Sequence, residues 1–206
     1  MHFEPEHSYH IFNQGNNREL IFFNREIYFF FLKKIETHIL PFADVLAYCL
    51  MPNHFHLMVY VNHPGLTVGV TAHKPCTHVS HPDSIMRTLN NSIGIMLRSY
   101  TRAVNNQKNR CGSLFREETK AECLTCNSNI TPSFFYTNQG ALINISNPGK
   151  EYPQVCNYYI HNNPVKAGLV KKPEDWEFSS FRNCFDFMLN KIYDEFFSET
   201  RQILQT

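Results

Sequence analysis

The chain has 206 residues, a length that fits one domain with insertions better than two full domains. Its formal net charge of +1 does not indicate a strongly basic nucleic-acid binder, so any such role falls to local basic clusters. The N-terminus carries no basic segment followed by an apolar core, and no apolar run approaches the ~18 residues of a membrane span. With an odd number of cysteines, seven, these features predict a reduced, cytoplasmic protein without a membrane partner.

The first part of the chain predicts a strand, a helix and a β-hairpin. Residues 8–14 alternate in polarity and carry β-formers, which is typical of a strand. Asn24 can cap a following helix, because apolar residues recur after it at helical spacing, and Pro41 ends that helix. Residues 43–50 and 54–61 predict two strands, and the Met-Pro-Asn turn between them makes the pair a hairpin.

The second part of the chain alternates between regular elements and polar segments. Residues 62–83 predict an irregular loop that ends at Asp83, the expected cap of a long helix. A fourth strand is expected within 111–124. Residues 125–150 have the composition of an inserted loop that contains a small hairpin, and a short helix follows over about 152–162.

The order of these elements is β-α-β-β-α-β-α. That order predicts an α+β fold, a ferredoxin-like antiparallel sheet with helices on one face. Two segments, at about 67–82 and 125–150, are insertions into this frame. We expect one domain over residues 1–185 and a C-terminal tail over 186–206.

Two histidines, His54 and His56, fall two residues apart in the strand 54–61. Residues at that spacing point to the same face of a sheet, so both imidazoles share one face, while Phe55 and its alternate neighbours face the core. Two imidazoles on a rigid element can bind one divalent cation, although the same pattern also occurs on a half-wet surface. Two ligands leave such a site open for a third group and for substrate.

The segment NYYIHNNPVKAGLV, residues 157–170, offers that third group. Tyr159 and Asn163 are four residues apart, so they share a helix face. Pro164 disfavours helix at the residue before it, so we expect Asn163 at the helix C-terminus. An amide oxygen there suits a hard metal, and a tyrosine one turn back would stand beside it. The alternative interpretation is that Tyr158 and Tyr159 only pack as aromatic residues and that Asn163 only ends the helix.

Taken together, the motifs resemble the REP-associated tyrosine transposases, which belong to the HUH single-tyrosine transposases of insertion sequences. The resemblance rests on HFH in a strand, on NQGNNRELIFFN near the N-terminus, on GSLFREETKA, and on YYIHNNPVKAGLV followed by WEFSSFR. It covers about residues 8–62, 84–123 and 152–183. Several ordered motifs are far more specific than a single His-x-His.

The resemblance implies a ferredoxin-like catalytic domain that cleaves and rejoins single-stranded DNA at hairpin-forming repeats, as in DNA transposition. It places the HUH metal ligands at His54 and His56, the nucleophile at Tyr159 and the polar helical ligand at Asn163. The expected metal is Mg²⁺ or Mn²⁺, which would polarise the scissile phosphate. Tyrosine attack leaves a 5′-phosphotyrosine, which conserves the energy of the broken bond for rejoining.

Several basic residues surround this predicted site and are candidate contacts to the DNA backbone. Each alone is a solvated surface charge as readily as a phosphate ligand, and the clustering is what favours DNA. The candidates are Arg18, Arg98, Arg102, Arg110, Arg116 and Lys120.

Several alternatives remain open. A non-cutting DNA-binding module of the same fold, a replication-initiator or relaxase type nickase, and a hydrolytic metal enzyme would share parts of these motifs. Tyr100 is a rival nucleophile, although Val104, four residues on, is not polar. A histidine- and cysteine-rich loop at 73–81 could form a zinc site with the CxxC motif at 123–126. Monomer and homodimer are equally compatible with the sequence, as are active sites within one chain or shared between two.

Overall fold

The computed structural model describes residues 1–69, 84–125, 135–136, 142–143 and 148–182. Its centre is a four-stranded sheet in the order β2-β3-β1-β6, and every neighbouring pair is antiparallel. The strands are β1 (Ser8–Gln14), β2 (Ala43–Met51), β3 (His54–Val61) and β6 (Lys120–Cys123). The α+β class, the antiparallel sheet and the predicted fourth strand are therefore confirmed.

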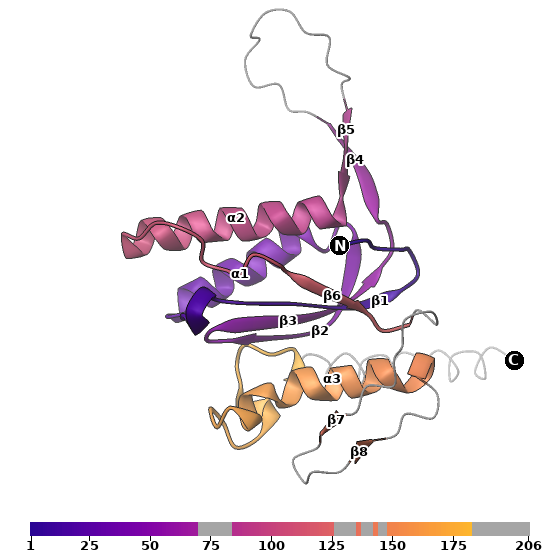
Figure 1. Cartoon of the computed structure of the whole chain (residues 1–206), viewed down its shortest axis with the longest axis vertical. Helices are drawn as coiled ribbons and strands as arrows, with labels where there is room; N and C mark the ends of the chain where they lie inside the picture. The colour runs from indigo at the N-terminus through magenta and orange to yellow at the C-terminus, as the bar shows by residue number, and fades with distance from the viewer. Residues whose placement is uncertain (70–83, 126–134, 137–141, 144–147, 183–206) are drawn as a thin grey trace, which may run out of the picture.

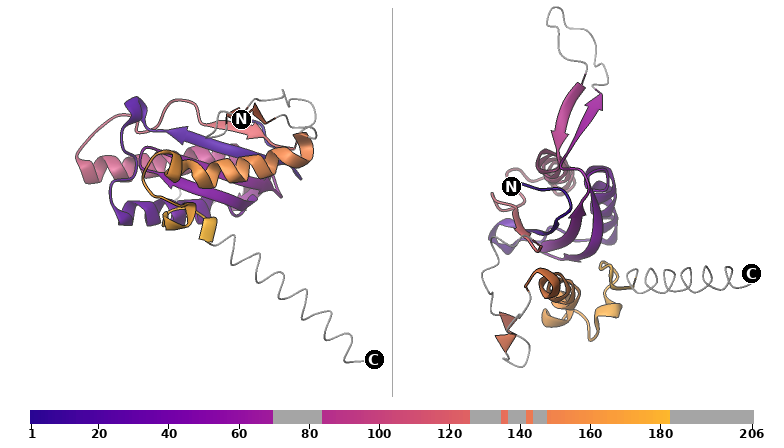
Figure 2. Two further views of the ribbon diagram at one scale, coloured as in Figure 1. Left: turned by 90° about the horizontal axis from the view of Figure 1, so that it is seen from below. Right: turned by 90° about the vertical axis from the view of Figure 1, so that its right-hand side faces the viewer.

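Helices cover both faces of the sheet. Helices α1 (Arg25–His38) and α2 (Leu89–Lys108) pack together on one face, and α3 (Pro148–Lys166) lies against the other (Figures 1 and 2). We expected the helices on one face only, and for α3 this was wrong. The reason is that the second face also carries buried side chains, including Met58, which require cover of their own.

The main core lies between the sheet and the α1–α2 layer. Strand alternation sends Ile11 of β1 and Phe55 of β3 to this face, where both are fully buried. Phe31 of α1 packs edge-on against the Tyr100 ring of α2, with the ring centroids 4.9 Å apart. The Tyr100 hydroxyl donates to the carbonyl of Ile21 at 2.6 Å, so its polar end is satisfied inside the core.

The N-cap of α1 is the residue that the sequence predicted, whereas the N-cap of α2 is a different one. The Asn24 side chain accepts a hydrogen bond from the amide of Ile27, the predicted N-cap. The cap of α2 is Thr88, not Asp83 as we expected. Residues Ser84–Thr88 instead form β5, which pairs with β4 (Gly65–Gly69), and strand pairing takes precedence over the local capping signal.

This β4–β5 ribbon projects from the body of the protein, as Figure 2 shows. The predicted loop at 62–83 is therefore in part a hairpin, while the histidine- and cysteine-rich stretch 73–81 falls outside the described residues. The hairpin expected within 125–150 is present as β7 (Phe135–Tyr136) paired with β8 (Leu142–Ile143).

Short elements and contacts fasten the chain at the sheet edges. Two 3-10 helices follow β1 and α3, η1 (Asn16–Arg18) and η2 (Pro173–Asp175). After η2, Trp176 donates from its indole nitrogen to the Leu50 carbonyl at 3.1 Å and so anchors the last described segment.

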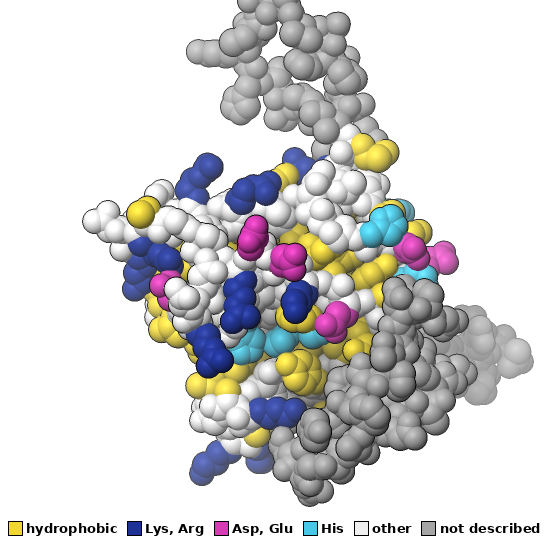
Figure 3. Space-filling view, viewed as in Figure 1, with side chains coloured by type: hydrophobic (Ala, Val, Ile, Leu, Met, Phe, Trp, Pro, Cys, Tyr) yellow, Lys and Arg dark blue, Asp and Glu magenta, His cyan; other side chains and the backbone are white. Residues whose placement is uncertain are grey.

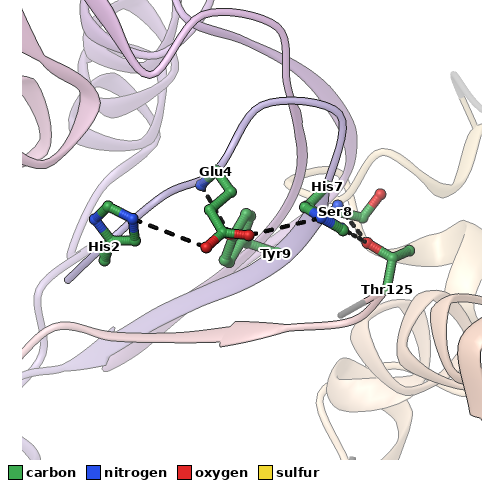
Figure 4. A network of polar contacts seen from close by, with 6 residues as sticks. All are labelled: His2, Glu4, His7, Ser8, Tyr9 and Thr125. Atoms are coloured by element: carbon green, nitrogen blue, oxygen red, sulfur yellow. Dashed lines mark hydrogen bonds and ion pairs between the residues drawn. The ribbon is translucent and has the colours of Figure 1, made fainter. Parts of the chain in front are cut away.

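Polar contacts hold the beginning of β1 beside the end of β6 (Figure 4). The Thr125 hydroxyl accepts from the Ser8 amide at 3.0 Å and lies 2.9 Å from Nδ1 of His7. Cys123, at the end of β6, is disulfide-bonded, so the prediction of reduced cysteines does not hold for this residue. In this state Cys123 is not a zinc ligand.

Within the described chain, no helix has both the length and the continuous apolar character needed to cross a bilayer.

Replacing Tyr100 by Phe tests the core hydrogen bond. The substitution keeps the ring but leaves the buried Ile21 carbonyl without its donor, which costs about 1–3 kcal/mol of unfolding free energy. Urea denaturation would show this as a lower midpoint with an unchanged m-value. An unchanged midpoint would mean that water or another donor replaces the hydroxyl.

Candidate active site

The register of β1, β3 and β6 gathers polar side chains on the face that α3 covers. Phe12 of β1 lies directly opposite His56 on one side and opposite Lys120 on the other. Gln14 lies opposite His54, and directly opposed residues in an antiparallel pair share a face. His54 and His56 thus lie on one face, as the spacing predicted.

A second, smaller cluster of apolar residues fixes α3 on this face. Cys156 and Ile160 of the helix are buried against Cys49 and Met58 of the sheet. Tyr159 is next to Ile160 on the helix and partly buried at the edge of this cluster. The burial of its neighbours therefore determines where the Tyr159 ring lies.

The Tyr159 ring stands over the histidines of its own chain. Its centroid is 5.4 Å from the His56 ring, with the two ring planes at 80°. A cavity of about 250 Å³ opens between the sheet and α3, and His54, His56 and Tyr159 all line it. The three sequence-predicted groups come together, and a single chain supplies all of them.

The two histidines use the same ring nitrogen for structural bonds. Nδ1 of His54 lies 2.6 Å from Oδ1 of Asn53, and Nδ1 of His56 lies 2.9 Å from Nε2 of His10. Nε2 of His56 is buried with no hydrogen-bond partner among the described residues. An unpartnered buried imidazole nitrogen is costly unless a ligand occupies it, so both histidines fit a metal through Nε2.

His10 was not among the residues that we predicted for the site. It is buried in β1, and its ring stacks on that of His56 with centroids 5.1 Å apart. If Nε2 of His56 is the metal-binding lone pair, Nδ1–H of His56 donates to His10, which fixes the tautomer. Alternation with Ile11 could have placed His10 on the polar face, but only the β1–β3 register shows that it reaches His56.

Burial keeps all three imidazoles neutral. Desolvation lowers the pKa of His10 to about 4 and also lowers the pKa of His54. The pKa of His56 is well below its usual value because of burial and, in addition, the neighbouring His10 and His54. Neutral imidazoles are the form that binds metal ions, so no proton has to be displaced at neutral pH.

Helix α3 does not stop before Pro164, as we had predicted, but continues to Lys166. Pro164 lacks an amide hydrogen, and the Asn163 side chain compensates by donating to the carbonyls of Tyr159 at 2.9 Å and Ile160 at 3.5 Å. The continued helix also places the Lys166 ammonium 5.3 Å from the centroid of the Tyr159 ring.

Asn163 lies one turn beyond Tyr159, as predicted, but it does not line the cavity of the histidines. Burial raises the pKa of Tyr159, and a hydrogen bond from the Asn163 side chain partly opposes this. No third histidine, cysteine or carboxylate in the described part of the chain completes a three-ligand set. Asn163 as a metal ligand stays a prediction.

The basic residues divide into three places. Arg98, Arg102 and Arg110 line a separate groove beside α2, Lys120 lines the histidine cavity, and Arg116 lines both. Arg18 lines neither of these two hollows. Figure 3 shows Lys and Arg side chains around a row of histidine side chains on the viewed side of the protein, with some Asp and Glu side chains among them.

The structure places Tyr100, the rival nucleophile, and the neighbouring His161 away from the site. Tyr100 is buried in the main core on the opposite face, where burial raises its pKa, so it is not accessible as a nucleophile. His161 lies two residues after Tyr159 on α3, and its Nε2 is 2.9 Å from the Ser180 hydroxyl; it does not line the histidine cavity. Glu118, by contrast, lines the histidine cavity and was not predicted.

Comparison with known proteins identifies the fold. No protein-family profile and no curated protein sequence matches this chain. A solved structure, that of a REP-associated tyrosine transposase bound to a REP hairpin, matches with a TM-score of 0.54. The chain has the fold of this transposase. The match covers 89% of this chain and 81% of the other at 14% sequence identity, so it confirms the resemblance in fold.

Acid should destabilise the metal-free protein through His10. Its pKa is about 4 in the folded chain and 6.5 in a solvated one, so between these values only the unfolded chain binds the proton. The stabilisation is complete above pH 6.5 and is lost as the pH falls to about 4. At about 1.4 kcal/mol per pKa unit, it is on the order of 3 kcal/mol.

Urea unfolding between pH 7.5 and 4, with a chelator present, measures this loss. His10→Gln should flatten the pH dependence, because an amide does not titrate. His63→Gln is the matched control, since it removes an exposed histidine that does not line the cavity. An equally steep slope in the His10 variant would contradict the assignment.

Proposed function

We propose that this protein cleaves and rejoins single-stranded DNA through a covalent bond between Tyr159 and a 5′-phosphate, as a transposase of the HUH single-tyrosine type. The observation that carries the proposal is the cavity that Tyr159 lines together with His54 and His56. Each histidine uses Nδ1 for a structural hydrogen bond, so its Nε2 is the nitrogen available to a metal ion. A nucleophile, two metal ligands and nearby cations are the parts that phosphodiester transesterification requires.

Tyr159 supplies the nucleophilic oxygen. Its Oη forms a bond to phosphorus while the bond from phosphorus to the 3′ oxygen breaks. The phenol releases its proton, the departing 3′ oxygen takes one up, and the 5′-phosphate remains on the protein. Attack by a 3′-hydroxyl on this phosphotyrosine reverses the step, so rejoining needs no nucleotide cofactor.

The chain's own cations assist the nucleophile. The pKa of Tyr159 is raised, chiefly by burial, so its phenolate needs nearby positive charge. Lys166 lies over the same ring and can stabilise both the phenolate and the incoming phosphate. The exposed Arg116 and Lys120 line the cavity and can bind the flanking phosphates.

His54 and His56 would bind a divalent cation, Mg²⁺ or Mn²⁺, which when bound polarises the scissile phosphate as a Lewis acid. Asn163 is the proposed third protein ligand. His10 is a positioning residue, because its bond to Nδ1 of His56 directs the other ring nitrogen toward the cavity. The solved neighbour was bound to a REP hairpin, which favours a hairpin-forming single strand as the substrate here.

Tyr159→Phe should abolish the covalent product. The protein would be incubated with Mn²⁺ and labelled hairpin DNA from the flanks of its gene, and adducts resolved on a denaturing gel. Tyr158→Phe is the matched control, because this neighbouring side chain is 67% exposed and does not line the cavity. Binding without any adduct in the unaltered protein would favour a non-cutting DNA-binding module instead.

Metal affinity should depend on His56 and on His10. His56→Ala removes a ligand and should abolish specific Mn²⁺ binding in calorimetry. His10→Phe removes only the orienting bond and should weaken binding by roughly 10–100-fold. His63→Gln controls for adventitious binding to exposed histidines. Unchanged Mn²⁺ affinity in the His56 variant would place the metal elsewhere.

A further inference from the structure

Residues 176–180, within the WEFSSFR motif, lie along the outer edge of β2, the first strand in the sheet order. Ser179 forms an antiparallel bridge with Cys49 of that strand. The Ser180 amide donates to the Tyr48 carbonyl at 3.0 Å. The main chain of residues 176–180, which we call the edge segment, is therefore hydrogen-bonded to the sheet in the manner of a further strand.

The edge segment is also fixed to α1 on the first face of the sheet. The Phe178 ring stacks on the Tyr28 ring, with centroids 3.7 Å apart and ring planes at 8°. Arg25, at the start of α1, donates from Nε to the Glu177 carboxylate at 2.9 Å. The Leu50 amide donates to the Phe178 carbonyl at 2.9 Å. Because both the sheet and α1 hold it, the edge segment is a fixed point against which α3 can be placed.

His161 joins α3 to this fixed point. Its Nε2 lies 2.9 Å from Oγ of Ser180, and both side chains are buried. The Ser180 hydroxyl also accepts from the Tyr48 amide at 2.8 Å and donates to the Tyr48 carbonyl at 3.3 Å. A hydroxyl has one proton and two lone pairs, so the remaining bond is one that His161 donates from Nε2–H. The contact is thus directional and shielded from water.

Tyr159, Ile160 and His161 point to different sides of α3, because successive residues are about 100° apart around a helix axis. Ile160 is buried against the sheet in the smaller apolar cluster. Tyr159 therefore lies on one flank of the helix and His161 on the opposite flank. The contacts agree with this placement, since Tyr159 lines the histidine cavity whereas His161 reaches Ser180 at the edge of β2.

Apolar packing alone fixes the rotation of α3 about its own axis only weakly. The contacts of Cys156 and Ile160 with the sheet are not directional, so a small rotation changes their energy little. The same rotation would swing the Tyr159 ring, whose centroid is 5.4 Å from that of His56, toward or away from the proposed metal ligands. A directional bond on the opposite flank opposes this rotation.

We propose that His161 is a positioning residue for Tyr159: its hydrogen bond to Ser180 fixes the rotation of α3 and so holds the phenol over His56. The proposal rests on the proposed function and adds to it a residue outside the histidine cavity. It also gives the edge segment a part in the reaction, because that segment supplies the acceptor. Precise placement matters for the rate, since a displacement of about 1 Å can slow a reaction on the order of 100-fold.

Three variants separate positioning from stability. His161→Leu removes the donor and keeps an apolar side chain in the buried position. His161→Gln restores a donor, because the amide nitrogen of glutamine can take the place of Nε2. Tyr100→Phe is the matched control, since it also loses a buried hydrogen bond, but in the main core on the other face of the sheet. It therefore lowers stability without releasing α3.

The first readout requires neither DNA nor metal. Each protein is labelled with fluorotyrosine, and the fluorine NMR signal of Tyr159 is assigned by its loss in Tyr159→Phe. We expect His161→Leu to shift or broaden this signal, whereas His161→Gln and Tyr100→Phe should leave it as in the unaltered protein. An unchanged signal in His161→Leu, or the same change in Tyr100→Phe, would overturn the proposal.

The second readout is the rate of adduct formation in a single turnover with Mn²⁺ and hairpin DNA. His161→Leu should form the adduct roughly 10–100-fold more slowly, with unchanged affinity for DNA and for Mn²⁺. His161→Gln should recover most of the rate, and Tyr100→Phe should keep it. Equal slowing in Tyr100→Phe, or no recovery in His161→Gln, would contradict a positioning role. Absence of any adduct from the unaltered protein would refute the cleavage proposal alone, because the fluorine signal is read without it.

Discussion

The register between β1 and β3 is the constraint on which the rest of the structure depends. It aligns Ile11 with Leu57 on the core face and Phe12 with His56 on the other face. Because side chains alternate along a strand, a slip of one residue would bury the histidines in the main core and expose its apolar side chains. The same pairing that stabilises the fold thus assembles the site.

The site is held in place by two kinds of contact. Apolar packing of Cys156 and Ile160 positions α3, so that Tyr159 reaches the histidines without making a specific bond to them. Hydrogen bonds to His10 and Asn53 fix the histidine rings themselves. Packing positions the proposed nucleophile, whereas directional bonds orient the proposed ligands.

The continuation of α3 through Pro164 has a consequence for the chemistry. A helix that ended before the proline would have left Lys166 in a loop. Instead the Asn163 side chain partly replaces the missing amide donor, and Lys166 stays on the helix face of Tyr159. Local preference for a helix stop is weak beside the packing of the helix on the sheet, and this is why the predicted boundary was wrong.

The sequence by itself determined the order of the four strands of the central sheet and the three helices, the cap at Asn24, the shared face of His54 and His56, and the spacing of Tyr159 and Asn163. These follow from local periodicity and backbone chemistry. Only the tertiary structure decided that α3 covers the second face, that Ser84–Thr88 is a strand, and that His10 bonds to His56. Each of these depends on which distant segments pair, and strand register and helix docking are not encoded in any local pattern.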